Sequence, residues 1–247
     1  MSKNPFFSII VITFNSEKTL EKSLNSLFIQ TFTNWELIAI DGSSSDSTLK
    51  ILNKYRNRIN YFVSEKDSGI YDAMNKGAAA STGQFLFFLN SDDEFFDNKV
   101  LEDVFKQIND DVDLLSAIVT KVYKKHQIIK KNRLTKENLK KGLMPPHQSM
   151  FIKKTLFGEV GGYNENYKSS GDFELCCKLF EHSPKYKYID RQIAFFNHGG
   201  MSSDKRIAYF ETFWIINNYF GRYFATIFYI KKIILEQGLK KIIKHLI

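Results

Sequence analysis

The stretch that most constrains the fold is residues 85–93, Phe-Leu-Phe-Phe-Leu-Asn-Ser-Asp-Asp, in which an apolar run leads directly into two adjacent carboxylates. A short apolar run bounded by polar residues predicts a buried strand of a parallel sheet. In open α/β sheets, ligands bind outside the carboxyl ends of the strands. Asp92 and Asp93, with Asn90 beside them, offer the hard oxygen atoms that Mg²⁺ or Mn²⁺ prefers. The alternative is that one of these acids caps a helix beginning near Asp97.

Apolar runs alternate with helical patterns along the first 90 residues. Leu20, Leu24 and Leu27, for example, recur at the spacing of one helix face. The alternation predicts an α/β fold with a doubly wound, mostly parallel sheet flanked by helices. The predicted strands are Phe7–Phe14, Trp35–Ile40, Ile59–Val63 and Phe85–Leu89, and the predicted helices run from Glu17 to about Gln30, from Thr48 to about Tyr55, and over Ile70–Ala80.

The second half of the chain is less regular. No internal repeat or low-complexity linker separates it from the first half. We therefore predict one catalytic domain over residues 1–203 and a basic, amphipathic helical extension over residues 204–247. Its predicted elements are one or two strands in Val112–Tyr123, a strand over His147–Ile152, a helix over Asp172–Phe180, a strand pair in Tyr186–Asp190 and Ile193–Asn197, and helices from Arg206 onward with breaks at Gly221 and Gly238.

Charge and cysteine content narrow the function classes. The net charge of +8 divides into −6 over residues 1–120 and +14 over residues 121–247. The basic half suits a phosphorylated substrate or anionic lipid, and it carries no nucleic-acid-binding motif, so we expect no nucleic acid partner. The two cysteines, Cys176 and Cys177, are neighbours and poor disulfide candidates, which favours a cytoplasmic location. The sequence has no signal-peptide pattern and no run of 18 apolar residues.

Polar residues follow three of the predicted strands at the edge where a parallel sheet binds its ligand. Thr13 and Asn15 follow the first strand, Asp41 the second, and Asp92 with Asp93 the fourth. Neither G-x-G-x-x-G nor G-x-x-x-x-G-K-[ST] is present, which disfavours a dinucleotide or P-loop site. An acid that could bond a base or ribose, together with an acidic pair that could hold a metal-bound diphosphate, predicts a nucleotide-sugar site.

Seven short motifs, in order, resemble glycosyltransferase family 2, the inverting enzymes with the GT-A fold. The resemblance covers roughly residues 6–200. Each motif is weak alone, and their shared order and spacing make the resemblance specific. The motifs are Ser8–Asn15, Ile40–Asp46, Asn75-Lys76-Gly77 with Ser81-Thr82-Gly83, Leu89–Asp93, His147-Gln148, Gly161-Gly162-Tyr163 and Gly171–Leu175.

The resemblance implies roles for the acids. Asp41 resembles the acid that contacts the donor nucleobase. Asp92 and Asp93 resemble the element whose metal bridges the donor diphosphate, although Asn90 stands where many relatives have its first acid. Asp172 resembles the catalytic base, and the alternative is that it caps the helix it begins.

The resemblance also implies roles on the donor diphosphate. Asn75 and Lys76 are expected near it. Met74 stands where many relatives carry an arginine that contacts the diphosphate, and Lys76 is near enough in the sequence to replace that arginine. His198, between flexible residues of the Asn197–Ser202 tract, resembles a late histidine that completes a metal shell or contacts the diphosphate. The alternative for His198 is a surface-loop histidine. His147-Gln148 is expected on the acceptor side or in a phosphate pocket, or as a polar pair at a strand end.

These observations predict a metal-dependent, inverting glycosyltransferase. It would move one sugar from a nucleoside-diphosphate sugar, with a UDP-sugar favoured, to a glycan or lipid-linked saccharide. The basic, aromatic segment after Arg206 either contacts an anionic membrane surface, which would make the protein peripheral on the inner face of the cell membrane, or packs against the domain or a second subunit. Two alternatives are a non-catalytic nucleotide-sugar-binding subunit and a sugar-phosphate nucleotidyltransferase.

Overall fold

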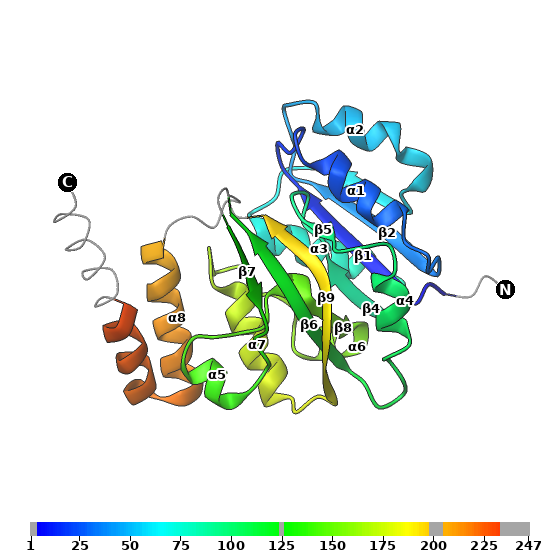
Figure 1. The fold of residues 1–247 in the computed structure, drawn as a ribbon. Helices are drawn as coiled ribbons and strands as arrows, with labels where there is room; N and C mark the ends of the chain where they lie inside the picture. The colour runs from blue at the N-terminus through cyan, green and yellow to red at the C-terminus, as the bar shows by residue number, and fades with distance from the viewer. Residues whose placement is uncertain (1–3, 124–125, 198–204, 233–247) are drawn as a thin grey trace.

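Nine strands form one curled sheet in the computed structural model, which describes residues 4–123, 126–197 and 205–232 (Figure 1). The strand order is β3-β2-β1-β4-β8-β6-β9-β5, and β7 pairs with β6 at the side. The strands are β1 (Phe7–Thr13), β2 (Trp35–Asp41), β3 (Tyr61–Ser64), β4 (Phe85–Phe88), β5 (Glu94–Phe95), β6 (Leu114–Val122), β7 (Gln127–Lys130), β8 (Met150–Lys153) and β9 (Tyr186–Asn197).

The first four strands are parallel, as predicted. β1 lies between β2 and β4, in a register that pairs Thr13 with Asp41. The carboxyl ends of β1, β2 and β3 therefore reach the same edge of the sheet. Beyond β4 the sheet becomes mixed, because β8 runs antiparallel to both β4 and β6 while β9 runs parallel to β6.

Helices cover both faces of this sheet (Figure 1). The alternation of side chains along β1 explains how, since successive residues of a strand point to opposite faces. Phe7, Ile9 and Val11 join a core with α1, α2 and α4, whereas Ile10 and Ile12 join a core with the other helices. The helices are α1 (Leu20–Phe28), α2 (Thr48–Lys54), α3 (Ile70–Ala80), α4 (Val100–Phe105), α5 (Lys136–Lys140), α6 (Lys154–Glu159), α7 (Gly171–Glu181) and α8 (Lys205–Phe220).

Three sequence predictions are corrected by the structure. The predicted strand His147–Ile152 begins as a 3₁₀ turn, η2 (His147–Ser149), and only β8 after it pairs with neighbours. The predicted strand pair in 186–197 is one long strand, β9, whose register against β6 shifts between residues 116 and 119. The first helix begins at Leu20 rather than Glu17. Bulges and 3₁₀ turns follow tertiary pairing, which local residue patterns do not encode.

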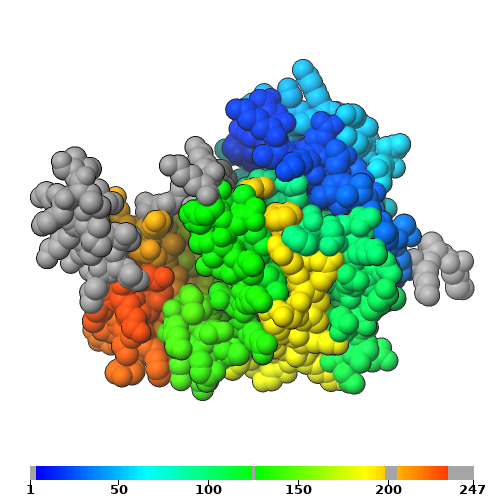
Figure 2. Space-filling view, in the orientation of Figure 1, coloured from blue at the N-terminus to red at the C-terminus, as the bar shows by residue number. Residues whose placement is uncertain are grey.

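The segment after residue 204 packs against the core that contains Ile10 and Ile12. Ile215 and Ile216 of α8 are fully buried there, and so is Ala225 in the helical residues 222–232 that follow. The predicted break at Gly221 is confirmed, because that glycine has a φ of +90°, and Gly238 lies outside the described residues. Figure 2 shows this orange and red segment against the green segment that contains α5. No helix among the described residues has the length and apolar character to cross a membrane.

Gly77 marks the closest approach of a helix to the sheet. A Cβ atom added at Gly77 of α3 would lie 2.4 Å from Cγ2 of Ile10 on β1, whereas one added at Gly158 of α6 would have no neighbour within 4 Å. We expect Gly77→Ala to lower the free energy of unfolding by about 1–3 kcal/mol, because it overpacks the core. Gly158→Ala should instead raise it by about 0.5–1 kcal/mol through helix propensity.

Denaturant unfolding of both variants measures the difference between the two glycines. Equal stabilisation by the two substitutions would contradict this description of the packing between α3 and β1.

Candidate active site

Asp93 lies after β4, at the edge of the sheet where the first strands end. Its side chain is fully buried. Its Oδ2 accepts a hydrogen bond of 2.9 Å from Nε2 of Gln148, and its Oδ1 accepts one of 3.3 Å from the backbone of Asn197. Burial, and then the neighbouring charge of Asp92, raise the pKa of Asp93 to about 7.

Asp92 is partly buried beside it. Burial raises the pKa of the Asp92 carboxyl above its ordinary value, while nearby His147 acts in the opposite direction. The backbone carbonyl of Asp92 accepts a hydrogen bond of 2.5 Å from Nδ2 of Asn197, so the last residue of β9 holds both acids. The helix-cap alternative for these acids is wrong, because β5 follows them directly and α4 begins only at Val100.

A polar chain of three side chains crosses the site. Nδ1 of His147 lies 2.9 Å from Oδ2 of Asp172, and Nε2 of His147 lies 3.1 Å from Nδ2 of Asn90. His147 is buried, with 8% of its surface exposed. Burial favours the neutral imidazole, but the adjacent Asp172 and the charges of Asp93 and Asp92 raise the pKa of His147 above its ordinary value.

Asp172 is the second residue of α7, and its carboxylate faces His147 rather than the helix backbone. The N-cap position of α7 is Ser170, which makes no side-chain cap hydrogen bond. Oδ1 of Asp172 is buried and has no hydrogen-bond partner in the part of the chain that the structure describes. The backbone amides of Ser169 and Ser170, just before the helix, donate to the carboxylate of Glu211 at 2.9 and 2.8 Å. Helix α8 thus fixes the loop that leads into Asp172.

The predicted donor-side residues gather around the loop after β2. Asp41 is fully buried; its carboxylate accepts hydrogen bonds from the hydroxyls of Ser44 and Ser64, at 2.5 and 2.7 Å, and from the Ser44 amide at 3.0 Å. Asn15, at a φ of +48°, accepts from the backbone of the same loop through its Oδ1. Thr13 is buried, and its hydroxyl has no hydrogen-bond partner among residues 4–123, 126–197 and 205–232. The nucleobase contact of Asp41 stays a prediction.

A contact between two hydroxyls joins the residues after β1 to the segment that carries Asp92 and Asp93. Oγ of Ser16, after β1, lies 2.8 Å from Oγ of Ser91, which precedes the two acids. The amide of Ser91 also donates to the carbonyl of Ile12 in β1. The residues predicted at the ends of β1, β2 and β4 therefore belong to one continuous edge of the sheet.

Asn75 and Lys76 of α3 are engaged in other contacts. Nδ2 of Asn75 donates to the Tyr163 carbonyl and to Glu165, both at 2.9 Å, so this amide holds the loop that follows α6. Lys76 pairs with Glu65 at 2.8 Å and with Asp72 at 3.2 Å. A role for either residue on the donor stays a prediction.

The acids fit the divalent metal that the family resemblance implies. Asp92 and Asp93 are adjacent oxygen donors whose raised pKa values show the cost of keeping two carboxylates ionised there, and a divalent cation would remove that cost. The described residues contain no group of three or more His, Cys, Asp and Glu side chains placed to hold a metal. His198, predicted as a third ligand, lies outside the described residues.

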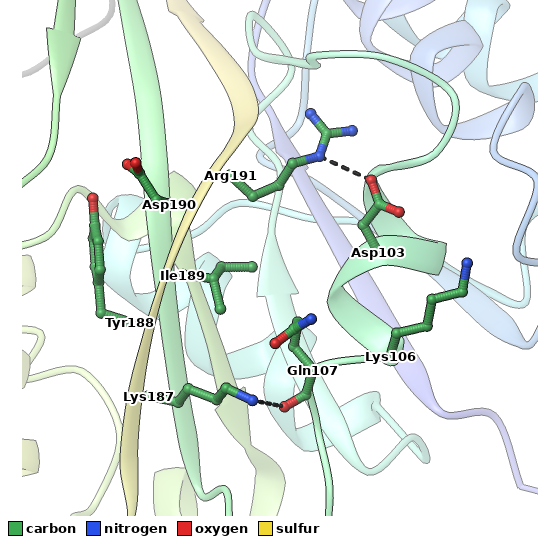
Figure 3. A pocket seen from close by; sticks show the side chains of 8 residues that line it. All are labelled: Asp103, Lys106, Gln107, Lys187, Tyr188, Ile189, Asp190 and Arg191. Atoms are coloured by element: carbon green, nitrogen blue, oxygen red, sulfur yellow. Dashed lines mark hydrogen bonds and ion pairs between the residues drawn. The ribbon is translucent and has the colours of Figure 1, made fainter.

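A separate hollow of about 490 Å³ lies between α4 and β9. Arg191 points across it and pairs with Asp103, while Lys187 donates to the backbone carbonyl of Gln107 (Figure 3). None of the predicted site residues that the structure describes lines this hollow.

Three functional contacts were not found from the sequence. They are the hydrogen bond of Gln148 to Asp93, those of Asn197 to Asp92 and Asp93, and that of Glu211 to the loop before α7. These contacts join positions that are 41 to 105 residues apart. The sequence singles out His147-Gln148, but it does not reveal that His147 contacts Asp172 and Gln148 contacts Asp93. The only local signal was the Pro145-Pro146 pair, which ends the preceding segment just before η2.

The raised pKa of Asp93 predicts how stability depends on pH. Because this pKa is about 7 in the folded state, the folded protein binds more protons than the unfolded chain between pH 4 and pH 7, and stability falls as pH rises. The rise from 3.8 to about 7 corresponds to at most about 4 kcal/mol. With chelator present, we expect Asp93→Asn to unfold at a higher temperature than the wild type at pH 8, with a difference that shrinks towards pH 5.

Thermal unfolding from pH 5 to pH 8 measures this difference. Asp190→Asn, at a carboxylate whose side chain is 72% exposed, should show no such trend. A difference for Asp93→Asn that grows as pH falls would contradict the burial of an ionisable Asp93.

Solved structures share this arrangement of strands and helices. TarS residues 1–349 from S. aureus, solved with UDP-GlcNAc, match with a TM-score of 0.71 and 22% identity over 89% of this chain and 73% of that one. The mannosyltransferase PcManGT from Pyrobaculum calidifontis, solved with GDP-Man and Mn²⁺, matches with a TM-score of 0.64 and 14% identity over 89% of this chain and 64% of that one. The chain spans 39% of the longer TarS chain.

Sequence comparison gives the family. A PGL/p-HBAD biosynthesis glycosyltransferase of Mycobacterium bovis is 31% identical over 206 residues, which are 81% of this chain and 80% of that protein. The sequence profile described as Glycosyl transferase family 2 matches residues 8–194, from β1 into β9. This range contains both acids after β4, the His147-Gln148 turn and Asp172. The chain therefore belongs to glycosyltransferase family 2.

Proposed function

We propose that this protein transfers one sugar from a UDP-sugar to a saccharide or lipid-linked saccharide, with inversion, and that Asp172 is the base. The proposal rests on one observation: an acid pair suited to a metal and an acid suited to act as a base both lie around His147. Asp92 and Asp93 offer a metal and diphosphate site, and Asp172 has a buried oxygen to which no described residue donates a hydrogen bond. His147 lies between them, with a hydrogen bond to the base and charge interactions with both other acids.

The proposed reaction is a single displacement. Oδ1 of Asp172 accepts the proton of an acceptor hydroxyl as that oxygen bonds to the anomeric carbon of the donor sugar. The bond from the anomeric carbon to the diphosphate oxygen breaks, and the nucleoside diphosphate leaves with the electron pair. A divalent metal held by Asp92 and Asp93 would stabilise the charge that develops on the diphosphate. Attack from the face opposite the leaving group gives inversion.

The choice of UDP rests on two supports. Asp41 is the last residue of β2 and pairs directly with Thr13 of β1, in the position that the family resemblance gives to the nucleobase contact. TarS, whose fold this chain shares, has been solved with UDP and with UDP-GlcNAc. A non-catalytic nucleotide-sugar-binding protein would need no base. Oδ1 of Asp172, which is buried and accepts no hydrogen bond from the described residues, favours an enzyme.

Thermal unfolding with UDP, GDP, dTDP or CDP, each with Mn²⁺, Mg²⁺ or chelator, tests the donor site. Saturation at 100 times the dissociation constant stabilises a folded protein by about 2.7 kcal/mol, or about 5–10 °C for a chain of this size. We expect UDP to raise the midpoint only with a metal. Asp172→Asn should keep this shift and lose sugar transfer, measured as UDP release with a saccharide acceptor, whereas Asp92→Asn should lose the shift.

Two results would count against the proposal. A shift that persists in chelator would remove the metal from the donor site. Transfer by Asp172→Asn at more than a few per cent of the wild-type rate would remove Asp172 from the role of base.

We further propose that the C-terminal helices contact an anionic membrane surface on the cytoplasmic side. Ile207, Phe210 and Trp214, spaced along one face of α8, are 38, 58 and 46% exposed, and Tyr223 and Ile230 in the following helix are 72 and 49% exposed. Basic residues flank this apolar surface at Lys205, Arg206, Arg222 and Lys231. Exposed aromatic side chains between cations suit the boundary between lipid headgroups and acyl chains. A lipid-linked acceptor would be presented at such a surface.

Flotation with vesicles of phosphatidylglycerol and phosphatidylcholine tests this surface. We expect the full-length protein to float, and the double variant Phe210→Ser, Trp214→Ser to lose most of the bound fraction because apolar insertion is lost. Ile29→Ser, at an equally exposed apolar residue after α1, is the control and should float like the wild type. Unchanged flotation of the double variant would contradict the proposal.

A further inference from the structure

We infer that His147 is a positioning residue for the base, and that the 3₁₀ turn η2 holds the base and the acid pair in one geometry. This inference rests on the proposed role of Asp172. It assigns to His147-Gln148 a task inside the catalytic site rather than on the acceptor side. The evidence is a set of hydrogen bonds that leaves a single carboxylate oxygen available for the reaction.

Nδ1 of His147 fixes one oxygen of the base. The distance from Nδ1 to Oδ2 of Asp172 is 2.9 Å. An ionised carboxylate only accepts hydrogen bonds, so the hydrogen of this bond belongs to Nδ1. The other ring nitrogen, Nε2, faces the side-chain amide of Asn90 at 3.1 Å. The ring is thus held at both nitrogens, and its orientation sets that of the carboxylate.

Oδ1 of Asp172 is the oxygen left for the acceptor. It is buried and has no partner among the described residues. A buried acceptor atom without a partner costs about 1–3 kcal/mol, so its retention points to a ligand that supplies a hydrogen when bound. An acceptor hydroxyl is such a ligand. Because His147 occupies Oδ2, the base can present only Oδ1 to that hydroxyl.

Gln148, the next residue of η2, performs the same task for Asp93. Its Nε2 donates to Oδ2 of Asp93 at 2.9 Å, and its side chain is almost fully buried. Two consecutive side chains therefore hold an acid of the metal site and the proposed base. A 3₁₀ turn suits this task, because its tight pitch places successive side chains about 120° apart, towards different neighbours.

The position of hydrogen on His147 gives a test that needs no substrate. Long-range ¹H–¹⁵N spectra of histidine-labelled protein report whether each ring nitrogen carries hydrogen, and the His147 signals are assigned by their loss in His147→Asn. We expect a protonated Nδ1 across pH 6 to pH 9, in the neutral ring and in the imidazolium alike. Asp172→Asn should shift the Nδ1 resonance. A bare Nδ1 in the neutral ring, or unchanged shifts in Asp172→Asn, would overturn the inference.

Two amide substitutions separate the two nitrogens of the ring. The amide nitrogen of asparagine is attached to Cγ, as Nδ1 is, so His147→Asn can still donate to Asp172. The amide of glutamine lies one bond farther out, near the position of Nε2, so His147→Gln keeps only the contact with Asn90. We expect His147→Gln to lower kcat roughly 100-fold, since a misplaced group of this kind costs about that much. His147→Asn should retain a kcat within about tenfold of the wild type.

Binding of UDP with Mn²⁺, measured by calorimetry, serves as the control for both variants. We expect both to bind with a dissociation constant close to that of the wild type and to keep the same KM for the donor. Equal loss of kcat in the two variants would overturn the inference, because it would show that the ring itself, for example as a proton carrier, is needed. Full activity of Asp172→Asn would instead refute the proposed base while leaving the spectra of His147 as found.

Discussion

The structure depends on the burial of one carboxylate, Asp93, beside another, Asp92. Transfer of a charged group from water to a protein interior costs several kcal/mol unless a partner compensates for it. Here the hydrogen bonds from Gln148 and Asn197 compensate only in part, and the pKa of Asp93 stays raised to about 7. A divalent cation on the two acids would complete the compensation, so binding of metal and donor would remove a strain present in the free protein.

The remainder of the fold brings distant residues to these two acids. The parallel strands β1, β2 and β4 supply the edge, and β9 returns to it with Asn197 at its end. The two hydrophobic cores on either side keep the strands in register, and α8 holds the loop before α7 through Glu211. The C-terminal helices therefore contribute to the placement of Asp172 as well as to the exposed aromatic surface.

Sequence reasoning predicted the first half of the fold closely, because hydrophobic periodicity there is local. The helix Ile70–Ala80 has the predicted bounds, and the first, second and fourth strands differ from prediction by one residue at one end. The family resemblance assigns Asp92, Asp93 and Asp172 to one site, and their roles there stay a prediction. Sequence reasoning could not show that the amide of Asn75 holds the Tyr163 loop, or that His147 faces Asp172, because these contacts depend on side-chain directions after folding. The second half was harder for the same reason: the course of β9 is set by its pairing with β6 and β5.

We propose that the metal site and the base lie together, with His147 between them. The most direct measurement is paramagnetic broadening of the histidine ring signals by substoichiometric Mn²⁺ in the presence of UDP, with Mg²⁺ as the diamagnetic reference. We expect the His147 signals to broaden selectively. The signals of His182, which is exposed and paired with Glu159 at the end of α7, should stay sharp. His147 signals that stay sharp under these conditions, and also when Mn²⁺ is raised until the UDP complex is saturated, would place the metal away from His147.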